Sequence, residues 1–322
     1  MLRRGLERVL DLGLATVEAE PAMKVVLFCG GLGTRLREYS ETGPKAMVNI
    51  GYRPIIWHLM KYYAHFGHTE FILCLGYRGD LIKRYFLDYD ECLSNDFELF
   101  GGSMNVRIHG RDIARWTITF ADTGLHSNIG QRLNAVRRYL GDDPVFLANY
   151  SDGLSDLPLP EYLDHFRRQD KIGSFVCVRP SQSFHVVALD DALVKDIRHV
   201  TTSDLWINGG FFVFKRQIFD YLKEGEDLVE EPFQRLIGLQ QLTAYRYHGF
   251  WACMDTFKDK QAFDDMEVRG DTPWQVWKSV GGGRSSQCRM EGQNARTAID
   301  TGQNGKSKTF AKISGKRLLK TK

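Results

Sequence analysis

Short apolar runs alternate along the chain with stretches in which hydrophobic residues recur every three or four positions. The runs at residues 25–28, 70–75 and 144–149 are too short for a stable helix and rich in β-formers, which predicts buried strands. Residues 53–66 and 80–89 have helical spacing and predict amphipathic helices. This order predicts an α/β fold with a mainly parallel sheet, helices on both faces and right-handed crossovers.

The second half of the chain continues this pattern. Further elements are predicted at 115–120 (strand), 128–139 (helix), 172–178 (strand), 205–214 (strand), 234–239 (helix) and 242–247 (edge strand). Asn208-Gly209-Gly210 interrupts the strand at 205–214. Glycines at such a place let a ligand approach the backbone, and Asn208 can both donate and accept hydrogen bonds.

Composition limits the class of protein. With 322 residues, the chain is long enough for one large domain or two modest ones. No apolar run approaches the ~20 residues of a membrane span. The six cysteines include no C-x-x-C pair and sit mostly in apolar runs, which is typical of buried free thiols in a reducing cytoplasm rather than of a zinc site.

The two ends of the chain differ from its middle. Residues 279–322 contain ten Lys or Arg and two acidic residues, so the net charge of +3 comes from this tail. The composition from residue 278 onward predicts disorder, and a charge run of this kind usually marks a solvated segment rather than a nucleic-acid site. Met23 directly precedes the first strand, and a start there would leave residues 1–22 as an extension that is not native. Residues 23–277 are the predicted folded domain.

A glycine-rich turn follows the first predicted strand. Gly30, Gly31 and Gly33 allow positive φ and a close approach of backbone N–H groups to phosphate oxygens. Arg35 and Lys45 add positive charge nearby, the first as a bidentate fork and the second as a mobile point charge. A turn that only links a strand to a helix is the alternative.

Two other phosphate-binding motifs are excluded. The P-loop requires a Lys-Ser or Lys-Thr pair after the glycines, and none follows. A dinucleotide-binding turn starting at Gly31 requires a third glycine where Leu36 stands, and the next strand ends at Gly76 rather than at a ribose-binding acid. A dehydrogenase is therefore disfavoured.

Two aspartates end apolar segments that lie far apart in the sequence. Asp152 follows the strand at 144–149 and precedes Gly153, while Asp255 follows the segment 251–254. Mg²⁺ requires few protein ligands, so two carboxylates suffice to hold a cation that bridges phosphates. An Asp-Gly pair is by itself only a turn in most proteins.

These residues together resemble the signature of the sugar-phosphate nucleotidylyltransferase family, in which a strand precedes Gly-Gly-x-Gly-x-Arg-Leu, a Pro-Lys pair and an apolar run. The matching segments are Gly30 to Leu36, Pro44-Lys45 and Met47-Val48. Residues 55–61 and 207–213 resemble further segments of the branch that transfers cytidylyl groups to glucose 1-phosphate. The resemblance implies a Rossmann-like catalytic domain over residues 23–277, with a small β-rich portion for the sugar.

The resemblance also implies a role for each candidate residue. Arg35 and Lys45 are expected to be catalytic, and Asp152 and Asp255 to hold Mg²⁺. The expected nucleotide contacts are Gly30, Gly31, Gly33 and Thr34 at the phosphates, with Thr123 and Gly130 at the base. The expected sugar contacts are Asn208, Gly209, Glu231 and Arg198. Two alternatives stay open, since Gly130 also fits a plain helix start and Glu231 a helix cap.

The sequence departs from the family pattern at three places. Arg198-His199-Val200 stands where most relatives have Glu-Lys-Pro, so Arg198 is the candidate to replace the lysine charge. Phe184-His185 replaces Phe-Gly, and Pro44-Lys45-Ala46 replaces Pro-Lys-Pro. These departures affect the expected identity of the sugar more than the expected type of reaction.

The expected reaction transfers a cytidylyl group from CTP to glucose 1-phosphate, giving CDP-glucose and pyrophosphate for sugar-nucleotide synthesis. The alternatives are the same reaction with another nucleotide or sugar, and a regulatory paralogue that binds without catalysis. The expected partners are CTP and a sugar 1-phosphate, with no nucleic acid and no membrane span. Self-association into a homo-oligomer in the cytoplasm is also expected.

Overall fold

The computed structural model describes residues 22–31, 43–101, 105–110, 112–180 and 184–281. The chain divides into two compact units, Met1–Val280 and Gly281–Lys322. All of the elements below belong to the first unit, apart from the last residue of η6. The expected extension at 1–22 and the tail at 278–322 lie almost wholly outside the described residues, so the predicted domain limits stay a prediction.

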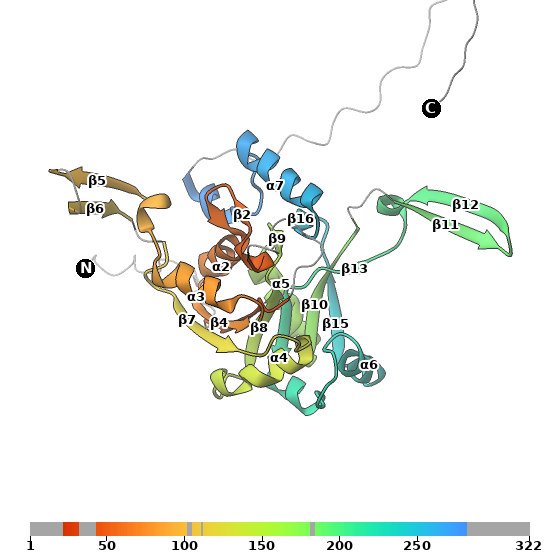
Figure 1. The fold of residues 1–322 in the computed structure, drawn as a ribbon. Helices are drawn as coiled ribbons and strands as arrows, with labels where there is room; N and C mark the ends of the chain where they lie inside the picture. The colour runs from red at the N-terminus through yellow and green to blue at the C-terminus, as the bar shows by residue number, and fades with distance from the viewer. Residues whose placement is uncertain (1–21, 32–42, 102–104, 111, 181–183, 282–322) are drawn as a thin grey trace, which may run out of the picture. The chain divides into compact units, whose positions relative to one another are not determined.

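One half of the central sheet is parallel (Figure 1). Its strands are β1 Val25–Phe28, β4 Glu70–Leu75, β7 Thr117–Asp122 and β8 Val145–Tyr150. Strand β1 lies in the middle, with β4 on one side and β8 on the other, and all four of its residues are buried. The short apolar runs of the sequence are therefore strands, as predicted.

The other half of the sheet is mixed. Its strands are β10 Gly173–Val178, β13 Ile207–Asn208, β14 Phe212–Lys215 and β15 Leu242–Arg246. Strand β14 pairs antiparallel with β8 and β10, and β15 adds to β10 in parallel. Among the described strands β15 has β10 as its only neighbour, which confirms the predicted edge strand.

Helices cover both faces of the sheet. Side chains alternate between the two faces along each strand, so a strand of apolar residues makes both faces apolar. Val25 and Leu27 of β1 belong to one core cluster, and Val26 and Phe28 belong to another. The first cluster contains residues of α2 Ile55–His65, α3 Gly79–Leu87, α5 Leu159–Gln169 and α7 Phe257–Arg269. The second contains residues of α4 Ile129–Val136 and α6 Glu231–Gly238.

Smaller elements connect or extend this framework. Two short pairs are β2 Asn49–Ile50 with β3 Arg53–Pro54, and β9 Gly153–Ser155 with β16 Trp251–Cys253. Two hairpins, β5 Asp96–Phe100 with β6 Asn105–His109 and β11 His185–Asp190 with β12 Leu193–His199, extend away from the central sheet (Figure 1). The 3-10 helices are η1 Lys45–Met47, η2 Glu91–Leu93, η3 Arg137–Tyr139, η4 Val200–Thr202, η5 Arg216–Asp220 and η6 Val276–Gly281. Neither hairpin was predicted.

Pro54 lies just before α2 rather than in its first turn, which corrects the predicted start of this helix. Its backbone is extended, with φ −69° and ψ 153°, and it pairs with Asn49 in the β2–β3 ladder. Within the described part of the chain, no helix is long and apolar enough to cross a membrane. The five cysteines found there are free thiols.

The interruption between β13 and β14 has a backbone cause. Gly210 and Phe211 both have positive φ, +77° and +51°, so the strand cannot continue through them. A Cβ on Gly210 would lie 2.5 Å from Asn149 Oδ1, which itself accepts a hydrogen bond from the Phe211 N–H at 3.0 Å. Glycine is thus required here both for its conformation and for space.

Replacing Gly210 by Ala should lower the free energy of unfolding by about 3 kcal/mol, because the positive φ and the contact with Asn149 add together. Gly225 is the matched control, since it has φ +83° and no atom within 4 Å of its ideal Cβ. Gly225→Ala should lower the free energy by only about 1 kcal/mol. Urea denaturation measures both values, and equal losses would contradict the steric part of this explanation.

Candidate active site

Functional side chains gather where the parallel strands end. Gly30 and Gly31 follow β1, Gly76 follows β4, and Asp152 follows β8. Carboxyl ends of parallel strands meet at one edge of a sheet, which is where α/β folds bind ligands. The glycine-rich turn therefore lies at the predicted edge. Gly33, Thr34 and Arg35 lie outside the described residues, so their roles stay predictions.

The β9–β16 pair brings the two predicted carboxylates together. Gly153 pairs with Cys253, and the Met254 N–H donates to the Asp152 carbonyl at 2.9 Å. Asp152 lies one residue before β9 and Asp255 two residues after β16, so the two side chains lie beside each other although about a hundred residues separate them.

Lys45 joins both carboxylates. Its amino group donates to Asp152 Oδ2 at 2.6 Å and to Asp255 Oδ1. Burial disfavours the charged form of Lys45, but the two carboxylates outweigh this effect and raise its pKa above the ordinary 10.5. Lys45 is accordingly a cation at neutral pH.

Two carboxylates directed at one cationic atom also form a suitable metal site. Oxygen-only ligands favour a hard divalent cation, and two protein ligands suffice when phosphate oxygens and waters complete the shell. Among the described residues no group of three or more His, Cys, Asp or Glu is arranged around a common point. The residues therefore fit a cation shared with a phosphate ligand, and the Lys45 ammonium stands where such a cation would be attracted.

Arg132, which was not among the predicted site residues, connects three strand ends. Its buried guanidinium donates to the carbonyls of Gly30 at 3.0 Å, Leu75 at 3.2 Å and Gly124 at 2.9 Å, and to the Thr123 hydroxyl at 2.8 Å. A Cβ on Gly30 would lie 2.0 Å from this guanidinium. Glycine is therefore required at this position for packing beneath the turn, while contact of Gly30 with a nucleotide stays a prediction.

The two residues predicted to contact the base, Thr123 and Gly130, both help to stabilise the fold. The Thr123 hydroxyl donates to the Leu75 carbonyl at 2.8 Å while it accepts from Arg132. A Cβ on Gly130 would lie 2.3 Å from the Glu226 carbonyl, so glycine is required for the packing of α4. The Asn128 and Gln131 side chains form a capping box at the start of this helix. Contact of Thr123 and Gly130 with a base stays a prediction.

A cavity of about 250 Å³, called here the Lys45 cavity, lies between the glycine-rich turn, Lys45 and Asp152, while Asp255 does not line it. Its lining includes Gly30, Gly31, Lys45, Asn128, Arg132, Tyr150, Asp152 and Asp227. Burial, with a smaller effect of Asp227, raises the pKa of Tyr150 to about 12, so its hydroxyl is protonated. The wall thus combines cations, carboxylates and neutral donors, a mixture suited to polyphosphate and hydroxyl groups.

Asn208 and Gly209 lie close to this cavity. The Asn208 amide donates to the Tyr150 hydroxyl at 3.3 Å, and Trp251 Nε1 donates to the Gly209 carbonyl at 2.8 Å. None of the four predicted sugar contacts lines the cavity itself. Arg198 is exposed on β12 and pairs with Asp196, while Glu231 is exposed in the first turn of α6.

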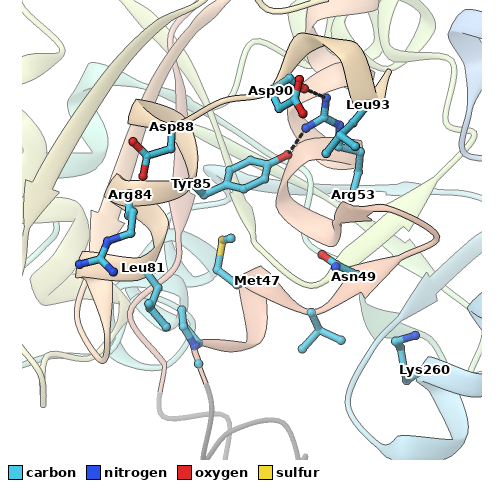
Figure 2. A pocket seen from close by; sticks show the side chains of 13 residues that line it. Met47, Asn49, Arg53, Leu81, Arg84, Tyr85, Asp88, Asp90, Leu93 and Lys260 are labelled. Atoms are coloured by element: carbon cyan, nitrogen blue, oxygen red, sulfur yellow. Dashed lines mark hydrogen bonds between the residues drawn. The ribbon is translucent and has the colours of Figure 1, made fainter. Parts of the chain in front are cut away.

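A larger cavity of about 610 Å³ is lined by Pro44 and Met47, on either side of the Lys45-Ala46 pair, and by Arg53, Tyr85 and Asp90 among others (Figure 2). None of the predicted site residues that the structure describes lines it. The clustering of charged groups around Lys45, rather than cavity volume, is therefore what identifies the candidate active site.

Comparisons with known proteins agree with this geometry. Residues 24–281 match the family model described as "Nucleotidyl transferase". A "Probable glucose-1-phosphate cytidylyltransferase" of Bacillus subtilis is 37% identical over 257 residues, covering 79% of this chain and 100% of the relative. A "Glucose-1-phosphate cytidylyltransferase" of Salmonella typhimurium is 35% identical over 258 residues, covering 80% and 100%.

The fold is also that of a solved UDP-glucose pyrophosphorylase complexed with UDP-glucose. The TM-score is 0.56 at 12% identity, and the match covers 78% of this chain and 100% of that one. At this identity the likeness concerns the fold alone. The family model and the two relatives settle the assignment: this chain belongs to the nucleotidyl transferase family.

Proposed function

We propose that the protein transfers the cytidylyl group of CTP to α-D-glucose 1-phosphate, forming CDP-glucose and pyrophosphate. The observation that carries this proposal is the convergence of Lys45, Asp152 and Asp255 at the carboxyl edge of the sheet. Relatives that share the whole domain and are named as glucose-1-phosphate cytidylyltransferases support the choice of nucleotide and sugar.

The reaction requires little more than alignment of the two substrates and neutralisation of their phosphate charges. A phosphate oxygen of the sugar phosphate forms a bond to the α-phosphorus of CTP, and the bond from that phosphorus to the oxygen bridging the α- and β-phosphates breaks. The second phosphate pKa is about 6, so the nucleophile is largely ionised at pH 7 and no general base is needed. In-line placement and neutralisation of the phosphate charges then account for catalysis.

The chain's own residues divide this work. Gly30 and Gly31 line the Lys45 cavity, and their backbone N–H groups would hold the triphosphate there. Lys45 would leave the carboxylates and neutralise charge between the phosphates of the two substrates. Asp152 and Asp255 would hold Mg²⁺, which supplies further neutralisation of the α-phosphate and of the departing pyrophosphate when it is bound.

The sugar and the setting of the enzyme are part of the proposal. Asn208, through Tyr150, and the Gly209 backbone are suitably placed near the cavity for sugar hydroxyls. We infer a homo-oligomer in the cytoplasm that supplies nucleotide sugars for cell-surface polysaccharides such as lipopolysaccharide O-antigen. The five free cysteines within the described residues are consistent with a reducing compartment.

Substrate choice is tested by pyrophosphate release from purified protein with Mg²⁺, glucose 1-phosphate and, in turn, CTP, UTP, dTTP, GTP and ATP. CTP should give a kcat/KM at least about 100-fold above each of the others, because a site that pairs with base edges rejects bases whose groups it leaves unpaired. Preference for another nucleotide would replace CTP in the proposal. No release with any of the five, despite CTP binding, would favour the regulatory paralogue.

The carboxylates are tested by Asp152→Asn and Asp255→Asn. Each variant keeps its size but loses charge, so kcat should fall by about 1,000-fold while the far-UV circular dichroism is retained. Asp265→Asn is the matched control, since Asp265 is exposed on α7, the helix that follows Asp255. Near-normal turnover in either active-site variant would contradict the metal assignment.

Arg132 supports the turn that would hold the triphosphate. Arg132→Met should lower the free energy of unfolding by about 3 kcal/mol, because four acceptors, three of them buried, each lose a hydrogen bond from the guanidinium. Arg132→Lys keeps the charge but cannot reach all of these acceptors, so its loss should be smaller. Titration calorimetry should show weaker CTP binding in both, and unchanged stability in Arg132→Met would contradict the role given to this side chain.

A further inference from the structure

Two arginines lie at the carboxyl edge of the sheet, outside the Lys45 cavity. Strand β14 runs antiparallel to β8 and to β10, and β15 lies beside β10 in parallel (Figure 1), so β8, β10 and β15 all end at this edge. Arg179 directly follows β10, and Arg246 is the last residue of β15. Neither arginine lines the Lys45 cavity, so the proposed reaction leaves both without a role.

The strand register places Arg246 beside a predicted sugar contact. Cys177 of β10 pairs with Asn208 on one side and with Arg246 on the other. Because adjacent strands are about 4.8 Å apart, the backbones of Asn208 and Arg246 are about 10 Å apart. Residues directly opposite each other in a sheet share a face, so these three side chains lie on one face. A sugar bound by Asn208 would therefore lie within reach of the long Arg246 side chain.

Trp206 holds both arginines. The guanidinium carbon of Arg179 lies 5.0 Å from the centre of the Trp206 ring, and that of Arg246 lies 5.4 Å from it. The face of an indole attracts cations, so the ring fixes where these two charges stand. The His248 ring meets the same indole edge to face, with centroids 5.2 Å apart. Arg179, Trp206, Arg246 and His248 are called here the Trp206 cluster.

The cluster carries more positive than negative charge. Arg179 donates to the Ser203 carbonyl and lies 3.7 Å from the carboxylate of Asp204, whose side chain is fully exposed, so this ion pair is weak. Within the described residues, the exposed guanidinium of Arg246 makes no hydrogen bond and no ion pair. Its planar set of donors is therefore available, and such a set matches the oxygens of a phosphate or a carboxylate.

The cluster lies on the far side of Asn208 from the expected reaction centre. Asn208 donates to Tyr150, which lines the Lys45 cavity, while β10 and then β15 lie on its other side. The phosphate that reacts would lie at Lys45, so an acidic group beside the two arginines would stand elsewhere on the sugar. Arg198, from which charge near the sugar was expected, instead pairs with Asp196 on β12.

We propose that the Trp206 cluster is an anion subsite for a second acidic group, a phosphate or a carboxylate, on the sugar of the sugar 1-phosphate. Arg179 and Arg246 would each donate hydrogen bonds to this group, while Asn208 binds a hydroxyl between it and the reacting phosphate. This assignment rests on the proposed function, since it places the sugar beside Asn208. It adds to that function a preference for acidic sugar 1-phosphates over glucose 1-phosphate.

The test compares pyrophosphate release from CTP with three acceptors: D-glucose 1-phosphate, D-glucuronic acid 1-phosphate and D-glucose 1,6-bisphosphate. At least one acidic sugar should have a KM about tenfold below that of glucose 1-phosphate with a similar kcat, because the subsite binds the substrate and takes no part in the reaction. A gain with the glucuronic acid alone assigns a carboxylate, and a gain with the bisphosphate alone assigns a phosphate. Equal KM values for all three acceptors overturn the proposal.

Arg179→Met and Arg246→Met should each raise the KM for the preferred acidic sugar by about tenfold more than the KM for glucose 1-phosphate. Arg246 is exposed, so its variant serves should Arg179→Met not fold. Arg107→Met is the matched control, since Arg107 is also exposed and lies 4.9 Å from an aromatic ring, that of Phe100, but on the β5–β6 hairpin. Its KM values should equal those of the natural chain. An equal rise for acidic and neutral sugars in Arg246→Met overturns the proposal.

The proposed function and the subsite can fail separately. If none of the three acceptors releases pyrophosphate from CTP, the proposed function is wrong, and titration calorimetry then decides the subsite. Glucose 1,6-bisphosphate should bind the natural chain about tenfold more tightly than glucose 1-phosphate does, and Arg246→Met should remove this difference. Equal affinities of the natural chain for the two sugars would overturn the subsite as well.

Discussion

The bond of the Lys45 ammonium to two carboxylates holds three distant segments of the chain at one point. Asp152 and Asp255 carry like charges and are adjacent because of the β9–β16 pair, so without a cation between them they would repel. Lys45 in turn is mostly buried and would be costly as an isolated charge. Each partner therefore requires the others, and any ligand that enters must replace these contacts with its own.

Under the proposed function, this requirement would make the site favour a complex of metal and nucleotide over either part alone. A divalent cation can take the place of the ammonium only if the ammonium gains another anion. In the proposed reaction a triphosphate at the glycine-rich turn would provide that anion, and Arg132 holds the Gly30 carbonyl of this turn. Arg132 differs from Lys45 in having carbonyls rather than carboxylates as its main partners.

Much of the fold could be predicted from local pattern because its central strands are buried on both faces. Strands β1, β4 and β8 read as continuous apolar runs, and the rule for parallel sheets then placed Gly30 and Asp152 at one edge. The hairpin β11–β12 was missed because its strands have no consistent alternation, and apolar residues such as Leu189 and Leu193 are exposed there.

The contacts within the site could be predicted only in part. The sequence pointed to both aspartates and to Lys45, but their meeting depends on β9–β16 pairing, which no local pattern reveals. Arg132 was missed because a charged residue in a helix is usually solvated. A signal existed, since Arg132 shares the apolar face of α4 with Leu133 and Val136. Arg198 was proposed from its position relative to a family motif, and the structure places it on the exposed hairpin.

The most direct test of this account is the affinity of Lys45→Met for Mn²⁺ in the absence of nucleotide, measured from the electron paramagnetic resonance signal of free Mn²⁺. If the Lys45 ammonium stands where the metal is attracted, its removal should tighten Mn²⁺ binding by about tenfold relative to the natural chain. Lys45→Arg, which keeps the charge, should bind Mn²⁺ as weakly as the natural chain. Equal or weaker binding by Lys45→Met would contradict the account, because the two carboxylates would then not be a metal site that Lys45 occupies.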